Sequence, residues 1–322
     1  MSTRSRRWFA GVLTAAALLG LVLPGSAAAT NRFPAVINGH APALHPEGIA
    51  WDPTRQAFLV GSVKHGTVSV VNRDGSASTL VDDARMASTV GLTVDAVRGR
   101  ILVAYGDAGV ADRSTPERHT GLGIFDLRTG RARHVVELAT GNHLINDVTV
   151  DPWGNAYVTD SSGDSIFRVD PAGRASVLVS DPRFSAGGGV GINGIVWHPG
   201  GYLLVGQYTS GTLFRVTLGA RPEVTEVALD RPVLGADGIA LRPNGTVEIV
   251  SNHLQGSADE AVTILASRTN WRSARELVHE PWPVPEPTTV AISPFGDYVV
   301  SGNLSILLQL GGTSDEFTLR RR

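Results

Sequence analysis

Acidic and amide side chains recur at one position of a short phrase that the sequence repeats. In each copy a first residue is followed by a small or polar residue, by alternating apolar residues, and often by an Asp-Pro turn. The first residues of the six copies are Glu47, Val90, Asn146, Asn193, Asp237 and Thr288. Two carboxylates and two carboxamides are oxygen donors of the kind that Ca²⁺ binds, together with water. If the fold brings these four side chains together, they predict a site for Ca²⁺ or another divalent cation.

A second interpretation of the same residues is local. Asn and Asp before Gly favour tight turns for backbone reasons alone, although Glu47 does not belong to that class. Without a metal, clustered carboxylates would repel one another and have to take up a proton. The Asp at the other end of the phrase, as in Asp52, Asp95 and Asp151, adjoins the turn, and we expect it to be structural.

Other chemistry is largely excluded. The sequence has no Cys, so disulfides, zinc thiolate sites and a cysteine nucleophile are impossible. Gly-x-Ser-x-Gly is absent, which disfavours a Ser-His-Asp hydrolase. The glycine-rich stretch 186–191 is not followed by Lys and does not fit a phosphate-binding loop. His143, three residues before Asn146, is a candidate base or substrate contact, or else a packing residue at the rim.

The repeated phrase returns after 43 to 56 residues, and such a period indicates a propeller or another repeat architecture. Within each copy the apolar residues alternate, which predicts strands, and Gly, Pro and Asp mark the turns between them. Four strands repeated six times predict an all-β, six-bladed β-propeller. Because the innermost strands of a propeller line its central channel, equivalent residues of different blades should meet at one mouth of that channel.

Two features of the repeat are left open by the pattern. The ring could close with 33–37 as a strand of the last blade, or with 316–319 in that place. The polar insertion 106–121 lengthens the second copy. It could be a solvated loop or a lid over the channel mouth.

Composition and the N-terminal residues predict an exported globular protein. Of 322 residues, 42% are hydrophobic, which suffices for a core, and the net charge of −2 predicts no basic face for nucleic acid. Arginines at 4, 6 and 7, an apolar run and Ala27-Ala28-Ala29 resemble a secretory signal peptide. We therefore expect a signal peptide over 1–29, a propeller over 30–322, and a secreted or periplasmic protein without a membrane anchor. A single transmembrane anchor is the alternative.

Several copies of the repeated phrase resemble the motifs of a known protein family. Residues 146–155, 193–197 and 237–245 resemble the blade motifs of the senescence-marker-protein/gluconolactonase (regucalcin-like) family, and 47–52 resembles its first-blade motif with Ile49 in place of Pro. The resemblance spans nearly the whole mature chain. It implies a six-bladed propeller with a divalent metal, usually Ca²⁺, at the channel mouth, and hydrolysis of lactones or related esters.

The resemblance also implies roles for single residues. The family's metal ligands fall on Glu47, Asn193 and Asp237, and Asp237 takes the place of the general base. Asn146 falls on a residue that borders metal and substrate, and we add His143 as a substrate-contact candidate. Members that handle sugar acids often carry Arg where this chain has Leu144. Gluconolactone itself is therefore in doubt as a substrate.

Two functions follow as expectations. The first is a secreted, Ca²⁺-dependent hydrolase of a small-molecule lactone or ester, in which the metal polarises the carbonyl and Asp237 activates water. The second is a propeller that binds a small molecule or a partner without hydrolysis, which the apolar residues Val90 and Leu144 near the predicted mouth favour. Substrate, metal identity and oligomeric state are not encoded in any motif of the sequence.

Overall fold

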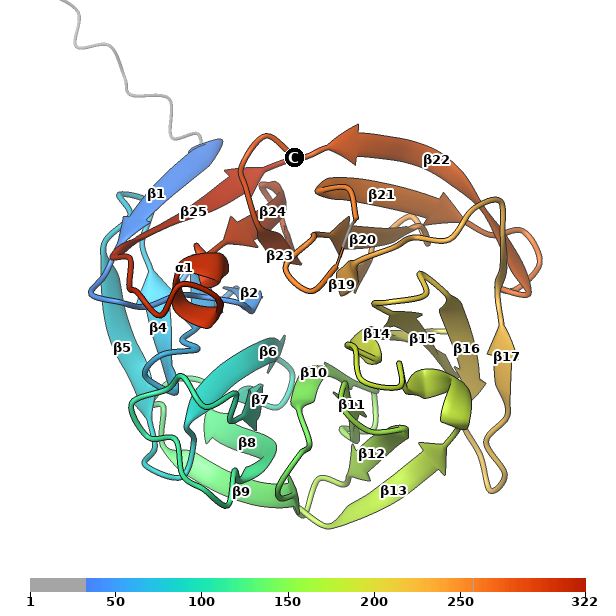
Figure 1. Cartoon of the computed structure of the whole chain (residues 1–322), viewed down its shortest axis with the longest axis horizontal. Coiled ribbons are helices and arrows are strands. Elements are labelled where there is room, and N and C mark those ends of the chain that lie inside the picture. Colours follow the sequence, from blue (N-terminus) through green and yellow to red (C-terminus); the bar gives the residue numbers. More distant parts are fainter. Residues whose placement is uncertain (1–32, 257) are drawn as a thin grey trace, which may run out of the picture. The chain divides into compact units, whose positions relative to one another are not determined.

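The computed structural model describes residues 33–256 and 258–322, and residues 33–322 form one compact unit. The predicted signal peptide lies outside the described residues. Six sheets are arranged in a ring, as Figure 1 shows, and their strands pair antiparallel except for one short parallel pair. The expected all-β, six-bladed propeller is confirmed.

The first three blades follow the chain in order. Blade 1 contains β2 (Ile49–Asp52), β3 (Ala57–Gly61), β4 (Thr67–Val71) and β5 (Ala77–Asp82). Blade 2 contains β6 (Ser88–Asp95), β7 (Arg100–Gly106), β8 (Thr120–Asp126) and β9 (Ala132–Ala139). Blade 3 contains β10 (Ile145–Val150), β11 (Ala156–Asp160), β12 (Ser165–Val169) and β13 (Ala175–Ser180).

Blades 4 and 5 continue this pattern with small additions. Blade 4 contains β14 (Ile192–His198), β15 (Tyr202–Gln207), β16 (Leu213–Thr217) and β17 (Val224–Glu226), preceded by the 3₁₀ turn η1 (Pro182–Phe184). Blade 5 contains β19 (Ala236–Leu241), β20 (Val247–Ser251), β21 (Ala261–Ala266) and β22 (Ser273–Pro281). The two-residue strand β18 (Ala228–Leu229) pairs in parallel with β22 and gives this blade a fifth strand.

Blade 6 closes the ring with both ends of the described chain. It contains β23 (Pro287–Ser293), β24 (Gly296–Ser301), β25 (Glu316–Arg321) and β1 (Val36–His40), with the short helix α1 (Leu304–Leu308) between β24 and β25. The C-terminal strand β25 pairs with β24, and β1 pairs with β25 as the outermost strand. The two segments predicted as alternatives therefore both take part, in adjacent positions.

The core lies between neighbouring blades. At the junction of blades 6 and 1, Phe58 and Tyr298 are fully buried and their ring centroids lie 4.7 Å apart. The turn aspartates act as expected on the backbone: Asp52 Oδ1 accepts from the amide of Thr54 at 2.8 Å, and Asp151 Oδ1 accepts from the amide of Asn155 at 2.8 Å. These contacts stabilise the hairpin turns of blades 1 and 3.

Candidate functional site

Five of the six first residues of the repeated phrase, called the column residues from here on, lie at β-bulges in the inner strands. The pairing register shifts at 89–92, 145–148, 192–195, 236–239 and 287–290, and each shift contains one column residue. Glu47 lies two residues before β2. A bulge adds a residue to one strand and re-aims its side chain. The alternative that the polar residues serve tight turns is therefore wrong for Asn146, Asn193 and Asp237, which lie inside strands.

Glycines beside the column allow neighbouring blades to touch. A Cβ on Gly48 would lie 2.2 Å from the carbonyl oxygen of Val90 in the next blade, and a Cβ on Gly194 would lie 2.2 Å from that of Asp237. No side chain fits at such a distance. The glycine of the repeated phrase thus serves the close packing of inner strands around the channel.

The structure brings the four polar column residues to one cavity of about 150 Å³. Glu47, Asn146, Asn193 and Asp237 all line it, together with Val90. Thr288 has a structural role instead, since its hydroxyl donates to the backbone oxygen of Glu47 at 2.6 Å and joins blade 6 to blade 1. Residues up to 190 positions apart therefore meet at the channel mouth.

Burial controls the charge of the two carboxylates. Burial, followed by the negative charges of Asp237 and Asp147, raises the pKa of Glu47 well above its usual range. Burial raises the pKa of Asp237 to about 7, although hydrogen bonds from Asn252 and Asn193 act in the opposite direction. A nearby cation would favour the charged form of both groups.

Asp147 is a third buried carboxylate that the sequence reasoning missed. It lies directly after Asn146, at the position that Gly holds in four of the other five copies. Its Oδ2 accepts from the amide of Ile195 in blade 4 at 3.1 Å, and its Oδ1 accepts from the amide of Val148 at 2.8 Å. Burial raises the pKa of Asp147 to about 7. The replacement of Gly by Asp at this position is the feature of the sequence that could have identified Asp147.

Asn252 and Tyr208 were missed as well. Asn252 Nδ2 donates to Asp237 Oδ2 at 2.6 Å, and the Tyr208 hydroxyl donates to Asn252 Oδ1 at 2.7 Å. Both residues lie just past the end of the second strand of a blade, which antiparallel pairing places beside the start of the inner strand. A second column, read at the ends of the second strands, would have found them.

The donor set fits a divalent cation. Glu47 Oε2 and Asn146 Oδ1 are buried in the described structure without a hydrogen-bond partner. Buried oxygens without partners are rare, and an ion is one explanation for them. Among the described residues, no group of three His, Asp or Glu side chains could hold a metal. A cation here would therefore depend on the amide oxygens as well as on the two carboxylates.

His143 lies apart from this cavity. Its Nδ1 lies 2.5 Å from Asp160 Oδ2, its side chain is 42% exposed, and it does not line the cavity that Leu144 and Asn146 line. Asp160 also accepts from the backbone amide of Leu144 at 3.1 Å. The contact therefore fixes the rim before Asn146, and a role of His143 in substrate binding stays a prediction.

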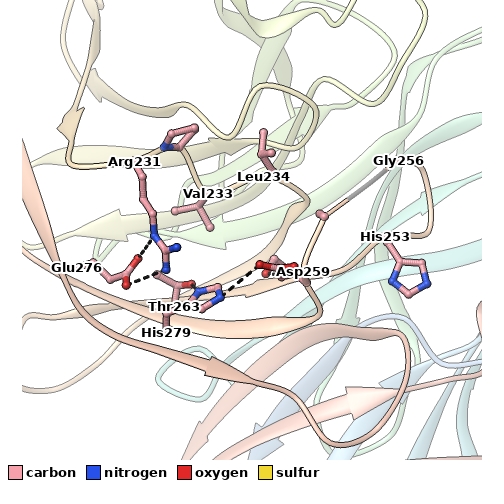
Figure 2. Close-up of a pocket in the computed structure, with 12 residues that line it drawn as sticks. Arg231, Val233, Leu234, His253, Gly256, Asp259, Thr263, Glu276 and His279 are labelled. Atoms are coloured by element: carbon pink, nitrogen blue, oxygen red, sulfur yellow. Dashed lines mark hydrogen bonds and ion pairs between the residues drawn. The ribbon is translucent and has the colours of Figure 1, made fainter.

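A separate groove of about 550 Å³ lies on blade 5. It lies across the 251–256 segment, where Ser251 and His253 line the groove while Asn252 and Leu254 line the central cavity. Figure 2 shows Arg231 turned to Glu276, with atoms 2.7 and 2.9 Å apart. Because the Arg231 guanidinium is paired with Glu276 and the four polar residues of the repeated phrase line the central cavity, we place the chemistry at that smaller cavity.

Comparison with known proteins agrees with this architecture. The family model described as "SMP-30/Gluconolactonase/LRE-like region" matches residues 45–257. The chain belongs to this family. No curated protein sequence matches this member of the SMP-30/gluconolactonase/LRE-like family.

Solved structures share the fold of this family member at low sequence identity. The Malassezia sympodialis allergen Mala s 1 has a TM-score of 0.70 and 17% identity, with 89% of this chain and 96% of that chain covered. A calcium-binding protein, regucalcin, from Agrobacterium tumefaciens has a TM-score of 0.61 and 18% identity, with coverage of 90% and 96%. A gluconolactonase from Xanthomonas campestris has a TM-score of 0.59 and 18% identity, with coverage of 89% and 89%.

In the described residues, no helix has the length and apolar character needed to cross a membrane.

Proposed function

We propose that this chain is a metal-dependent hydrolase of a small lactone or related ester. The observation that carries the proposal is the convergence of Glu47, Asn193 and Asp237 on one cavity that also contains the unpartnered oxygen of Asn146. Membership of the SMP-30/gluconolactonase/LRE-like family supports lactonase-type chemistry. Ca²⁺ is the proposed metal because the donors are all oxygens.

Glu47, Asn193 and Asp237 would hold the cation, with Asn146 beside it. When bound, a divalent cation polarises a carbonyl oxygen and offsets the negative charge that develops there. The chain's own contribution is to place Asp237, whose Oδ2 is fixed by Asn252, inside a buried cavity.

Asp237 is proposed as the general base. It would accept a proton from water while the water oxygen bonds to the carbonyl carbon, and the proton would pass to the alcohol oxygen as the ester C–O bond breaks. A bound cation would favour the charged form of Asp237, which is the form that accepts a proton. Asn193 and Asn252 would keep its orientation constant during the reaction.

The test compares Asp237→Asn with Asp164→Asn, which changes an exposed aspartate on blade 3. Lactone and aryl-ester hydrolysis is measured with added Ca²⁺ and with chelator. We expect Asp237→Asn to lose at least 100-fold in kcat/KM, on the order expected for a positioned base, and Asp164→Asn to keep it. Equal rates for wild type and Asp237→Asn, or rates indifferent to chelator, would contradict the proposal.

Export is a separate part of the proposal and rests on residues 1–29. Expression of the full chain in a bacterial host with a secretion pathway, followed by mass spectrometry of the exported product, tests it. A mature N-terminus close to residue 30 in the exported product supports export. A product that stays in the cell and still carries residues 1–29 contradicts it.

A further inference from the structure

The central cavity combines a polar set of residues with an apolar remainder. The polar residues lie in or just before the inner strands, or follow the second strands as Tyr208, Asn252 and Gln255 do. Most of the apolar side chains come from loops at the mouth and from α1. The apolar contributors that matter here are Val63, Val90, Leu144, Leu254, Leu304 and Leu308. Val63, Leu254 and Leu304 follow the second strands of blades 1, 5 and 6, so three separate blades supply hydrocarbon to one rim.

This apolar rim is a packed structure. Val63, Leu304 and Leu307 form a buried cluster, and Val110, Leu254 and Leu308 pack against it. The helix α1 is tied down at both ends: the amide of Ser305 donates to Glu286 Oε2 at 2.9 Å, and Gln309 Nε2 donates to the backbone oxygen of Leu254 at 2.9 Å. The side chains that face the cavity are therefore held in place.

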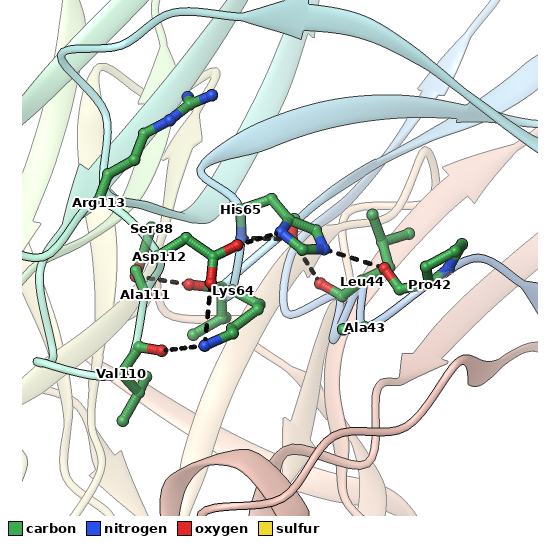
Figure 3. Close-up of polar contacts among 12 residues, drawn as sticks. Pro42, Ala43, Leu44, Lys64, His65, Ser88, Val110, Ala111, Asp112 and Arg113 are labelled. Carbon is green, nitrogen blue, oxygen red and sulfur yellow. Dashed lines mark hydrogen bonds and ion pairs between the residues drawn. The ribbon is translucent and has the colours of Figure 1, made fainter.

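The insertion after β7 braces the same rim from blade 2. Figure 3 shows Asp112 between Lys64 and His65 of blade 1. Asp112 lies 3.1 Å from Lys64 Nζ and 2.7 Å from His65 Nδ1, and Lys64 also donates to the backbone oxygen of Val110 at 3.1 Å. Through these contacts the insertion packs Val110 on the rim cluster and adds Ala108 to the cavity wall. The insertion is therefore part of the wall of the mouth.

The rim offers little to a polyhydroxylated substrate. Among the described residues that line the cavity, none is Lys, Arg or His. Leu144 lines the cavity at the position where family members that handle sugar acids often carry Arg. A hydroxyl buried against leucine and valine would lose its hydrogen bonds to water without replacement, which is unfavourable. A hydrocarbon group in the same place would instead leave water for an apolar surface.

We infer that the cavity takes a lactone or ester with a hydrocarbon substituent, in which the carbonyl faces Glu47, Asn193 and Asp237 and the substituent packs on α1 and Leu254. This inference rests on the proposed hydrolase function. The volume of about 150 Å³ equals the share of about five water molecules in the liquid. It suits a five- or six-membered ring with a short chain.

The experiment uses the full propeller with Ca²⁺ and a series of γ-lactones with alkyl chains from methyl to hexyl, with glucono-δ-lactone for comparison. Each methylene that enters the rim should raise kcat/KM about three- to fourfold until the cavity is full. Leu308→Gln should flatten this dependence, because it replaces hydrocarbon of the cavity wall with an amide. Leu310→Gln is the matched control, because Leu310 lies two residues further along and is 77% exposed.

Binding of non-hydrolysable γ-lactams with the same chains separates this inference from the hydrolase proposal. If no lactone is hydrolysed but lactam affinity rises with chain length and falls in Leu308→Gln, the substrate class stands and the hydrolase proposal fails. If glucono-δ-lactone is the best substrate, or the chain-length dependence is flat in the wild type, the hydrocarbon inference is overturned while hydrolysis stands. Absence of binding by every alkyl lactam also overturns it.

Discussion

Asn252 donates from Nδ2 to Oδ2 of Asp237 over 2.6 Å, across the hairpin of β19 and β20. The same Nδ2 donates to the backbone oxygen of Pro287 in blade 6 at 2.8 Å. Asn252 Oδ1 in turn accepts from the Tyr208 hydroxyl of blade 4. Three blades therefore fix one amide side chain, and that amide fixes the proposed base. The orientation of Asp237 therefore depends on contacts from blades 4, 5 and 6.

Tyr208→Phe tests this chain of contacts. The change removes the hydroxyl that donates to Asn252 and accepts from the amide of Gln255 at 3.1 Å. We expect a loss of about 1–3 kcal/mol in the free energy of unfolding, because buried groups are left without partners. We also expect kcat/KM on the best lactone to fall about tenfold as Asn252 and Asp237 lose their fixed orientation. Denaturant unfolding and steady-state kinetics measure the two effects.

Tyr157→Phe provides the control for that variant. The Tyr157 hydroxyl donates to Asp151 Oδ2 at 2.9 Å, within a buried network at a turn of blade 3. Its removal should cost similar stability while leaving kcat/KM unchanged. If both variants lose activity equally, the loss reflects general destabilisation and the positioning role of Tyr208 is wrong.

The metal-free protein should lose stability as pH rises. Burial raises the pKa of Asp147 and of Asp237 to about 7 and that of Glu47 well above its usual range. The folded state therefore binds more protons than the unfolded state between about pH 4 and pH 7, and stability falls as pH rises through that window. We expect the melting temperature in chelator to be several degrees lower at pH 8 than at pH 5.

Added Ca²⁺ should reverse this trend, because it binds the charged carboxylates of the folded state. The calcium-induced rise in melting temperature should be larger at pH 8 than at pH 5. Glu47→Gln, which keeps the shape and removes one charge, should be more stable than wild type in chelator at pH 8 and respond less to Ca²⁺. If the melting temperature of the wild type changes with neither chelator nor pH, the proposal of a metal at the channel mouth is wrong.

Glu248 makes a separate contribution to pH dependence, at the junction of blades 5 and 6. Its Oε2 lies 3.4 Å from Arg242 Nε, which donates to Asp297 Oδ2 at 2.9 Å. Burial and the charge of Asp297 raise the pKa of Glu248 to about 7. Since this pKa is raised, the stability that depends on the protonated form is lost as pH rises towards and through 7.

Glu248→Gln should therefore stabilise the protein above pH 8, by on the order of 1–3 kcal/mol, and have little effect near pH 4. Urea unfolding at the two pH values measures this difference. Glu223→Gln, at an exposed position of blade 4, is the control and should change neither value. Equal effects of Glu248→Gln at both pH values would show that Arg242 keeps the carboxylate charged throughout.

The sequence predicted those features that depend on local pattern. Alternating residues and turns at a regular spacing indicated six four-stranded blades, and the first residue of each copy predicted the cavity-lining Glu47, Asn193 and Asp237. Asn252 and Tyr208 escaped because their proximity to Asp237 arises from pairing between strands and blades. The apolar helix α1 escaped because five residues are too few to show a helical period.

The ring closure shows the same limit. Residues 36–40 and 316–321 pair with each other over five positions, from Val36 with Arg320 to His40 with Glu316. Each segment alone has the pattern of a strand, so each was a candidate for the last blade. Which of two strands lies outside the other depends on how the chain returns to its start, and no single segment encodes that order.

Gly194→Ala tests whether the close approach of inner strands positions the site. A Cβ at this position would lie 2.2 Å from the carbonyl oxygen of Asp237 and 2.8 Å from Ile239 Cγ1. Because two strands of different blades must move apart, we expect a loss of about 1–3 kcal/mol or more. Asn193 and Asp237 flank this contact, so the calcium-induced rise in melting temperature should shrink as well. Gly219→Ala meets no atom within 4 Å at an exposed turn and should change neither property. A Gly194→Ala protein that is destabilised but keeps the full response to Ca²⁺ would show that the metal ligands do not depend on this packing.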